Sequence, residues 1–136
     1  MSGYVVDASI VGPLLIPDEV QSEHPALIGL LESGLVVVPC HWHLEVASMG
    51  RAAIARKRVA EEAMLNGLSA LAGYSIKVDE ETPAAAWART LELTFIHKLT
   101  VYDAAYVELA LRLNAPLLCD DRDMANAAAA LDLELL

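Results

Sequence analysis

Short apolar runs that are stopped abruptly by turn-forming residues constrain the fold of this chain most. Residues Leu35–Val38 are uniformly apolar, and Pro39 follows them directly. A run without polar alternation is typical of a strand that is covered on both faces. Similar runs at Tyr4–Val6 and Leu117–Cys119, and the short segment Ile76–Val78, predict three more strands of the sheet.

Helical patterns separate these runs. The spacing of apolar residues predicts a short irregular helix over residues 10–16 and longer helices over residues 18–32, 41–57, 61–72, 83–98, 103–113 and 123–131. Residues 133–136 are expected to add a final edge strand. Strands that alternate with helices pair in parallel through right-handed crossovers. The sequence therefore predicts one α/β domain over residues 1–136, with a central, mainly parallel sheet.

Composition supports this fold and indicates a compartment. Hydrophobic residues make up 56% of the chain and aromatic residues only 5%, which suits helices packed on a parallel sheet. No apolar run reaches the roughly 20 residues of a membrane span, and the first residues lack the pattern of a signal peptide. Cys40 and Cys119 form no CxxC pair and are expected to be free thiols. We therefore expect a cytoplasmic protein.

The charge balance argues against broad electrostatic capture of nucleic acid. The chain has 19 acidic and 9 basic residues, for a formal net charge of −10. A nucleic-acid substrate must then be held by bound cations and by a local basic patch. The candidate patch is a basic cluster predicted near the end of the helix 41–57, formed by Arg51, Arg56, Lys57 and Arg58.

Four carboxylates have positions that point to one site. Asp7 ends the first strand, Asp121 lies just past the fourth, and Asp103 stands at the start of a helix. Glu45 lies one turn into the helix after the second strand. Ligands of open parallel sheets gather at the carboxyl ends of the strands, so these side chains can meet there. Crowded carboxylates favour a hard divalent cation, although each Asp could instead be an ordinary helix cap.

Several segments resemble the successive motifs of PIN domains, and within that family the likeness is to VapC-type toxins of toxin–antitoxin pairs. The likeness extends from about Tyr4 to Leu135. Its most specific piece is the stretch Thr100–Tyr106. The other matching segments are residues 4–9, 43–47 and 117–123.

This resemblance implies a three-layer α/β/α sandwich and metal-dependent cleavage of RNA. The family's acidic residues correspond to Asp7, Glu45, Asp103 and Asp121, which would bind Mg²⁺ or Mn²⁺. Ser9 matches a hydroxyl residue that supports the first Asp, and Asp123 is expected as an outer acid. The likeness also implies homodimers and an antitoxin that clamps the toxin.

Other functions stay open at this point. A receiver-like or phosphatase-like domain also gathers aspartates at strand ends, but Asp7 is followed by Ala8 and Ser9, without the second Asp of such phosphatases, and no Lys follows a late strand. A non-catalytic PIN-like scaffold that binds RNA or protein is the main alternative to the nuclease. The residues themselves do not distinguish RNA from DNA, so the preference for RNA rests on the resemblance.

Overall fold

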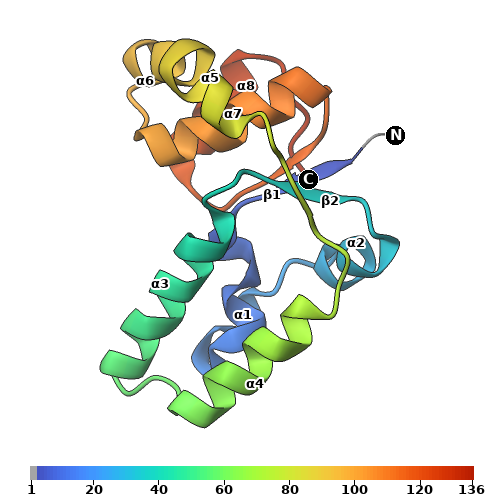
Figure 1. The fold of residues 1–136 in the computed structure, drawn as a ribbon, viewed down its shortest axis with the longest axis vertical. Coiled ribbons are helices and arrows are strands. Elements are labelled where there is room, and N and C mark those ends of the chain that lie inside the picture. The colour runs from blue at the N-terminus through green and yellow to red at the C-terminus, as the bar shows by residue number, and fades with distance from the viewer. Residues whose placement is uncertain (1–2) are drawn as a thin grey trace.

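One four-stranded parallel sheet organises the chain in the computed structural model, which describes residues 3–136 (Figure 1). Its strands are β1 (Tyr4–Val6), β2 (Val36–Val38), β3 (Lys77–Val78) and β4 (Leu117–Leu118), in the order β3-β2-β1-β4. Val5 of β1 pairs with Val37 on one side and with Leu117 on the other. The parallel α/β fold predicted from the apolar runs is confirmed.

Helices cover both faces of this sheet and complete three layers. One layer holds α1 (Gly12–Leu15), α2 (Leu27–Ser33), α3 (Trp42–Ala55) and α4 (Glu61–Ala72). The other holds α5 (Thr82–Ala85), α6 (Leu91–His97), α7 (Val101–Leu113) and α8 (Arg122–Ala130), as Figure 1 shows. Within residues 3–136, every helix is too short or too polar to span a membrane.

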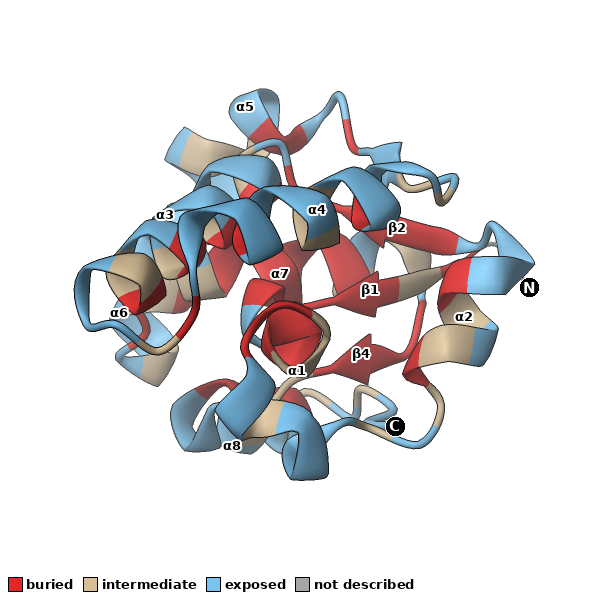
Figure 2. Ribbon diagram, turned by 90° about the horizontal axis from the view of Figure 1, so that it is seen from below, coloured by how far each residue is buried: buried red, intermediate tan, exposed pale blue. Residues whose placement is uncertain are grey.

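The core lies on both faces of the sheet, against α7 on one face and against the layer of α1 to α4 on the other (Figure 2). Val5, Val6 and Leu118 in the strands and Tyr106 in α7 are fully buried. The sequence predicts an amphipathic helix over residues 103–113, yet every residue from 104 to 110 is buried. The reason is tertiary, because α6 and the segment before it pack against α7 on the side away from the sheet.

Two of the predicted helices are broken in the structure. The range 18–32 contains a 3-10 turn over Pro17–Ser22 and then α2, since Pro25 has no backbone N–H to donate in between. The range 83–98 contains α5, a π turn over Ala86–Thr90 and α6, with non-helical angles at Ala88 (φ −119°, ψ −106°). The wider π turn changes the direction in which α6 presents its side chains.

Residues 133–136 do not form the edge strand that the sequence predicts; they add one β-bridge to the sheet. Leu135 forms a single parallel bridge with Leu117. Two backbone hydrogen bonds hold it, from Leu117 N to Glu134 O (2.9 Å) and from Leu136 N to Leu117 O (3.1 Å). This contact covers the outer side of β4 without extending the sheet.

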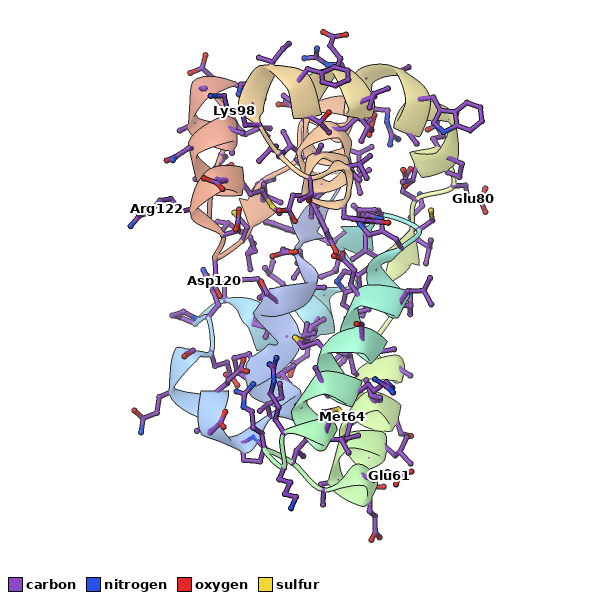
Figure 3. The ribbon with its side chains drawn as sticks, turned by 90° about the vertical axis from the view of Figure 1, so that its left-hand side faces the viewer. Glu61, Met64, Glu80, Lys98, Asp120 and Arg122 are labelled. Carbon is purple, nitrogen blue, oxygen red and sulfur yellow. The ribbon has the colours of Figure 1, made fainter. Side chains whose placement is uncertain are left out.

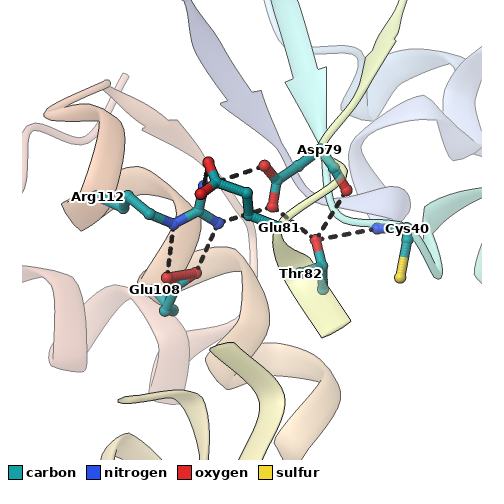
Figure 4. Close-up of polar contacts among 6 residues, drawn as sticks. All are labelled: Cys40, Asp79, Glu81, Thr82, Glu108 and Arg112. Atoms are coloured by element: carbon teal, nitrogen blue, oxygen red, sulfur yellow. Dashed lines mark hydrogen bonds and ion pairs between the residues drawn. The ribbon is translucent and has the colours of Figure 1, made fainter. Parts of the chain in front are cut away.

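A network of charged side chains holds the segment that follows the edge strand β3 (Figure 4). Arg112 of α7 donates to both oxygens of Asp79 (3.0 and 2.7 Å) and to both oxygens of Glu108 (2.8 and 3.0 Å). Asp79 and Glu108 are 7% and 5% exposed. Thr82 donates to Asp79 (2.7 Å) and accepts from the backbone N–H of Cys40 (3.3 Å). The network therefore ties α7, the start of α5 and the turn after β2 together.

We expect Arg112→Met to lower the free energy of unfolding by about 3 kcal/mol, because it leaves two buried carboxylates without their cation. The matched control is Arg89→Met, which removes an exposed ion pair with Glu92 and should lower it by less than about 1 kcal/mol. Urea unfolding of both variants measures the difference. Equal effects would contradict a structural role for the network.

Candidate functional site

The four predicted carboxylates meet at the carboxyl edge of the sheet. Asp7 follows β1, Asp121 follows β4, and Asp103 and Glu45 lie in the first turns of α7 and α3. All four line one cleft of about 300 Å³, together with Ala8, Ser9 and Met49. The structure thus brings together side chains that are up to 114 positions apart in the sequence, from Asp7 to Asp121.

Local backbone structure explains how two of these side chains are placed. Thr100 caps α7 by accepting a hydrogen bond from the backbone N–H of Asp103 (3.1 Å), which leaves the Asp103 carboxylate free of the capping role. Asp121 does cap its helix, since its Oδ2 accepts from the backbone N–H of Met124 (2.8 Å). Asp7 makes no capping hydrogen bond. The capping alternative therefore holds for Asp121 alone.

Neighbouring hydroxyl groups anchor the other side of the cleft. Ser9 Oγ donates to Asp7 Oδ2 (2.6 Å), and the phenol of Tyr106 donates to Glu45 Oε1 (2.5 Å). His41 Nε2 lies 3.2 Å from the same Glu45 oxygen, without the geometry of a hydrogen bond. These contacts use one carboxylate oxygen of each residue. They orient the carboxylates and leave Oδ1 of Asp7 and Oε2 of Glu45 outside these bonds.

Burial and mutual repulsion dominate the electrostatics of the cleft. Burial raises the pKa of Asp7 to about 6 against the hydrogen bond from Ser9, and the charges of Glu45 and Asp103 add to the rise. Burial also raises the pKa of Asp103, followed by the charges of Asp121 and Glu45. Burial alone would raise the pKa of Glu45, but the contacts with His41 and Tyr106 outweigh it and lower that pKa. The cleft thus concentrates negative charge at a partly buried place.

Two neighbouring groups stay neutral for the same reason. Burial and the contact with Glu45 raise the pKa of Tyr106 far above its usual range, so the phenol keeps its proton and remains a donor. Burial and then the charges of Asp7 and Asp121 raise the pKa of Cys119 to about 12. Cys119 is therefore a thiol, not a thiolate, in this environment.

Other predicted site residues lie outside the cleft lining. Asp123 is exposed in the first turn of α8, where its charge helps to raise the pKa of Asp103. The basic cluster lies at the end of α3 that points away from the sheet. Figure 3 shows Glu61, which begins α4 just beyond the cluster, near the opposite end of the molecule from Lys98, with Asp120 at a height between them. Arg51, Arg56 and Lys57 are exposed, but Arg58 is paired with Asp18 (2.6 Å) and Glu19 (2.7 Å).

The sequence analysis missed the partners of Glu45. His41 stands four positions before Glu45, the spacing that places two side chains on one helix face. Tyr106 lies within the stretch Thr100–Tyr106, but its core-like helical spacing gave no sign of a polar contact with α3. Only the tertiary packing of α7 against α3 brings its phenol to Glu45.

The donor set of the cleft fits a hard divalent cation. Carboxylate oxygens are the ligands that Mg²⁺ and Mn²⁺ prefer, and burial, with the charges of neighbouring carboxylates, raises the pKa values of Asp7 and Asp103, a cost that a bound cation relieves. Over residues 3–136, no three acidic, His or Cys side chains already stand close enough to hold an ion between them. Repelling carboxylates are expected to stand apart in this way until a cation draws them together.

Comparisons with known proteins agree with this fold. The model of the PIN domain family matches residues 4–130. The crystal structure of PAE2754 from Pyrobaculum aerophilum is similar, with a TM-score of 0.68 and 22% identity over 92% of this chain and 85% of that chain. A search of curated proteins found no match. Because the family model spans nearly the whole chain, the protein belongs to the PIN domain family.

Proposed function

We propose that the protein is an endoribonuclease that depends on Mg²⁺ or Mn²⁺, with Asp7, Glu45, Asp103 and Asp121 as the metal ligands. The observation that carries this proposal is the gathering of these four carboxylates in one cleft at the carboxyl edge of the sheet. PIN domains are generally nucleases that use divalent metals, which supports the same chemistry.

Each residue of the cleft has a separate task in this proposal. A bound cation supplies the activation of water and the stabilisation of charge on the phosphodiester. Asp7 and Asp103 contribute the crowded charge that favours cation binding, and Ser9 fixes the orientation of Asp7. Tyr106 positions Glu45, because its neutral phenol holds one Glu45 oxygen and leaves the other outside this bond. Asp121 is held by the start of α8.

The proposed substrate is RNA, and the preference over DNA rests on the likeness to VapC-type toxins. The formal net charge of −10 opposes binding of a phosphate backbone, so the cation has to neutralise the place where the scissile phosphate lies. Arg51, Arg56 and Lys57 stay candidates for contacts with more distant phosphates. Arg58 is a weaker candidate, because Asp18 and Glu19 already neutralise it.

We extend the proposal to partners and setting. The protein would be the toxin of a toxin–antitoxin pair, acting as a single domain in the cytoplasm, and it would form homodimers. Exposed apolar side chains support association, with Trp87, Phe95 and Ile96 at 92%, 76% and 60% exposure. Sedimentation that finds only monomers would contradict the dimer. Unchanged inhibition after removal of the C-terminal segment of an antitoxin would contradict the clamp.

Cleavage of RNA by the purified protein tests the enzyme directly. With Mn²⁺ or Mg²⁺ we expect fragments of a total-RNA pool that disappear with chelator. Asp7→Asn should reduce the rate by more than about a hundredfold, beyond the tenfold to hundredfold effect typical of groups that only support a ligand. The matched control is Asp132→Asn, an exposed aspartate outside the cleft, which should leave the rate unchanged.

The outcomes separate the nuclease from the scaffold. If wild type and Asp7→Asn are equally inactive on RNA and DNA, the catalytic proposal fails and a binding scaffold becomes the better account. If only DNA is cut, the metal site stands and the assignment of RNA is wrong.

Stability of the metal-free protein should depend on pH through Asp7. The folded state keeps the Asp7 proton up to about pH 6, whereas the unfolded chain releases it near pH 3.8. Between these values the folded state binds more protons, so the free energy of unfolding falls as pH rises from about 4 to about 6. The expected loss is up to about 3 kcal/mol, measured by urea unfolding with chelator present.

Asp7→Asn is the control, because it removes the titrating group from the cleft. Its stability should lack this fall, and addition of Mg²⁺ should restore stability to the wild type above pH 6. If the stability of the two proteins changes with pH in the same way, the pKa of Asp7 is not raised in the folded state.

A further inference from the structure

A second pocket lies at the turn after β2, and two of its lining residues contact or directly precede carboxylates of the cleft: His41 contacts Glu45, and Tyr102 precedes Asp103. It has a volume of about 240 Å³, and its wall is almost entirely apolar. Its lining includes Cys40 and His41 from the turn, Thr90 from the π turn, and Val101, Tyr102 and Ala105 from α7. We call it the base pocket, and it has no role in the metal chemistry proposed above.

His41 connects the two places, because it lines the base pocket and contacts Glu45, which lines the cleft. One side of its ring faces Glu45, with Nε2 at 3.2 Å from Oε1. The ring also contacts Tyr102, with the centroids 5.6 Å apart and the planes at 57°. Tyr102 directly precedes Asp103, one of the four carboxylates of the cleft. The base pocket is therefore linked to two of the proposed metal ligands, to Glu45 through His41 and to Asp103 through its neighbour Tyr102.

The base pocket combines an exposed aromatic side chain with an unpartnered hydroxyl group. Tyr102 is 59% exposed although its ring is a large hydrophobic surface. Thr90 is only 1% exposed, and its hydroxyl oxygen has no hydrogen-bond partner among the described residues. Buried hydroxyl groups normally have a partner, so Thr90 is a polar group that the surroundings of the pocket leave unsatisfied.

The walls of the base pocket are held in place before any ligand binds. Thr82, another lining residue, accepts from the backbone N–H of Cys40 (3.3 Å) and donates to Asp79 (2.7 Å), which Arg112 anchors (Figure 4). The turn that carries Cys40 and His41 is thereby fixed against α5 and α7. A preformed pocket needs little reorganisation when it binds.

We propose that the base pocket binds one nucleobase of the RNA substrate, beside the phosphodiester that lies in the carboxylate cleft. This inference rests on the proposed nuclease function. Unpaired bases of single-stranded RNA are bound by stacking on aromatic side chains and by hydrogen bonds to their edges. Tyr102, which is exposed, and His41, which contacts it, provide the rings.

Charge and size both favour a nucleobase as the occupant. The cleft and the chain as a whole are acidic, so much of the affinity for RNA has to come from its uncharged part. Stacking of a neutral base is insensitive to this repulsion. The volume of about 240 Å³ lies just below the range of pockets that hold drug-sized molecules, which suits a group as small as one base.

The test uses Tyr102→Ala in the cleavage reaction with Mn²⁺ and short single-stranded oligoribonucleotides. We expect KM to rise about tenfold, the effect of losing one base–aromatic stack, whereas Tyr102→Phe, which keeps the ring, should stay near wild type. Leu65→Ala is the matched control, because Leu65 is 58% exposed on α4 and lines no part of either site. Its KM should equal that of wild type.

An abasic substitution in the RNA identifies the contact itself. In wild type, removal of one base next to the cleavage site should raise KM about as much as Tyr102→Ala does. With Tyr102→Ala the same abasic RNA should bring no further rise, since the partner is already absent. Additive effects at every position would overturn the assignment of the base pocket.

Alkylation of Cys40 gives a readout that needs no cleavage. Cys40 is an exposed thiol on the pocket wall, whereas the raised pKa of Cys119, about 12, keeps that thiol unreactive. With Asp7→Asn as background, the oligoribonucleotides should slow Cys40 alkylation, and they should do so less when Tyr102→Ala is added. Equal protection in both proteins would overturn the inference.

The outcomes separate this inference from the nuclease proposal. If wild type cleaves with Mn²⁺ and Tyr102→Ala has an unchanged KM, the nuclease stands and the base pocket does not bind RNA. If Tyr102→Ala changes only the affinity of a protein inhibitor, the base pocket belongs to that partner and the inference is wrong. If wild type does not cleave at all, the nuclease proposal fails, and the alkylation of Cys40 alone decides whether the base pocket binds RNA.

Discussion

Burial of several carboxylates close together at the carboxyl edge of the sheet is the constraint on which the site depends. Parallel pairing of β1 with β2 and β4 brings the residues after each strand to one edge, so Asp7 and Asp121 become neighbours. Burial and nearby charges then raise the pKa of Asp7 to about 6. The folded protein thus keeps a local electrostatic cost that only a proton or a cation relieves, and this links the fold to its proposed chemistry.

The surroundings of the cleft hold this strained arrangement in place. Ser9 and Tyr106 each fix one carboxylate oxygen, and the start of α8 fixes another on Asp121. Farther out, the Arg112 network joins α7 to the turn after β2 and so positions His41, which lines the base pocket and contacts Glu45. In this account the cation in the cleft binds a phosphate of the RNA and the base pocket binds a neutral base. Together they would let an acidic protein bind an acidic substrate.

The sequence predicts the fold and the four carboxylates because both depend on local patterns. Uniform apolar runs indicate buried parallel strands, and acidic residues directly after them fall at the same edge. Contacts made by packing were not predictable in this way. The phenol of Tyr106 reaches Glu45 across 61 positions, the π turn at Ala86–Thr90 follows no Gly or Pro signal, and Arg58 is neutralised by acids 39 and 40 positions away.

Titration of Mn²⁺ into the chelator-treated protein, followed by calorimetry, tests the central claim most directly. The account predicts saturable binding to the wild type and loss of that binding in Asp103→Asn, whose carboxylate lines the cleft without capping a helix. The variant should remain folded, because its substitution removes charge that the cleft repels. Absence of binding to the wild type, or equal binding to a folded Asp103→Asn, would contradict a metal site at this edge of the sheet.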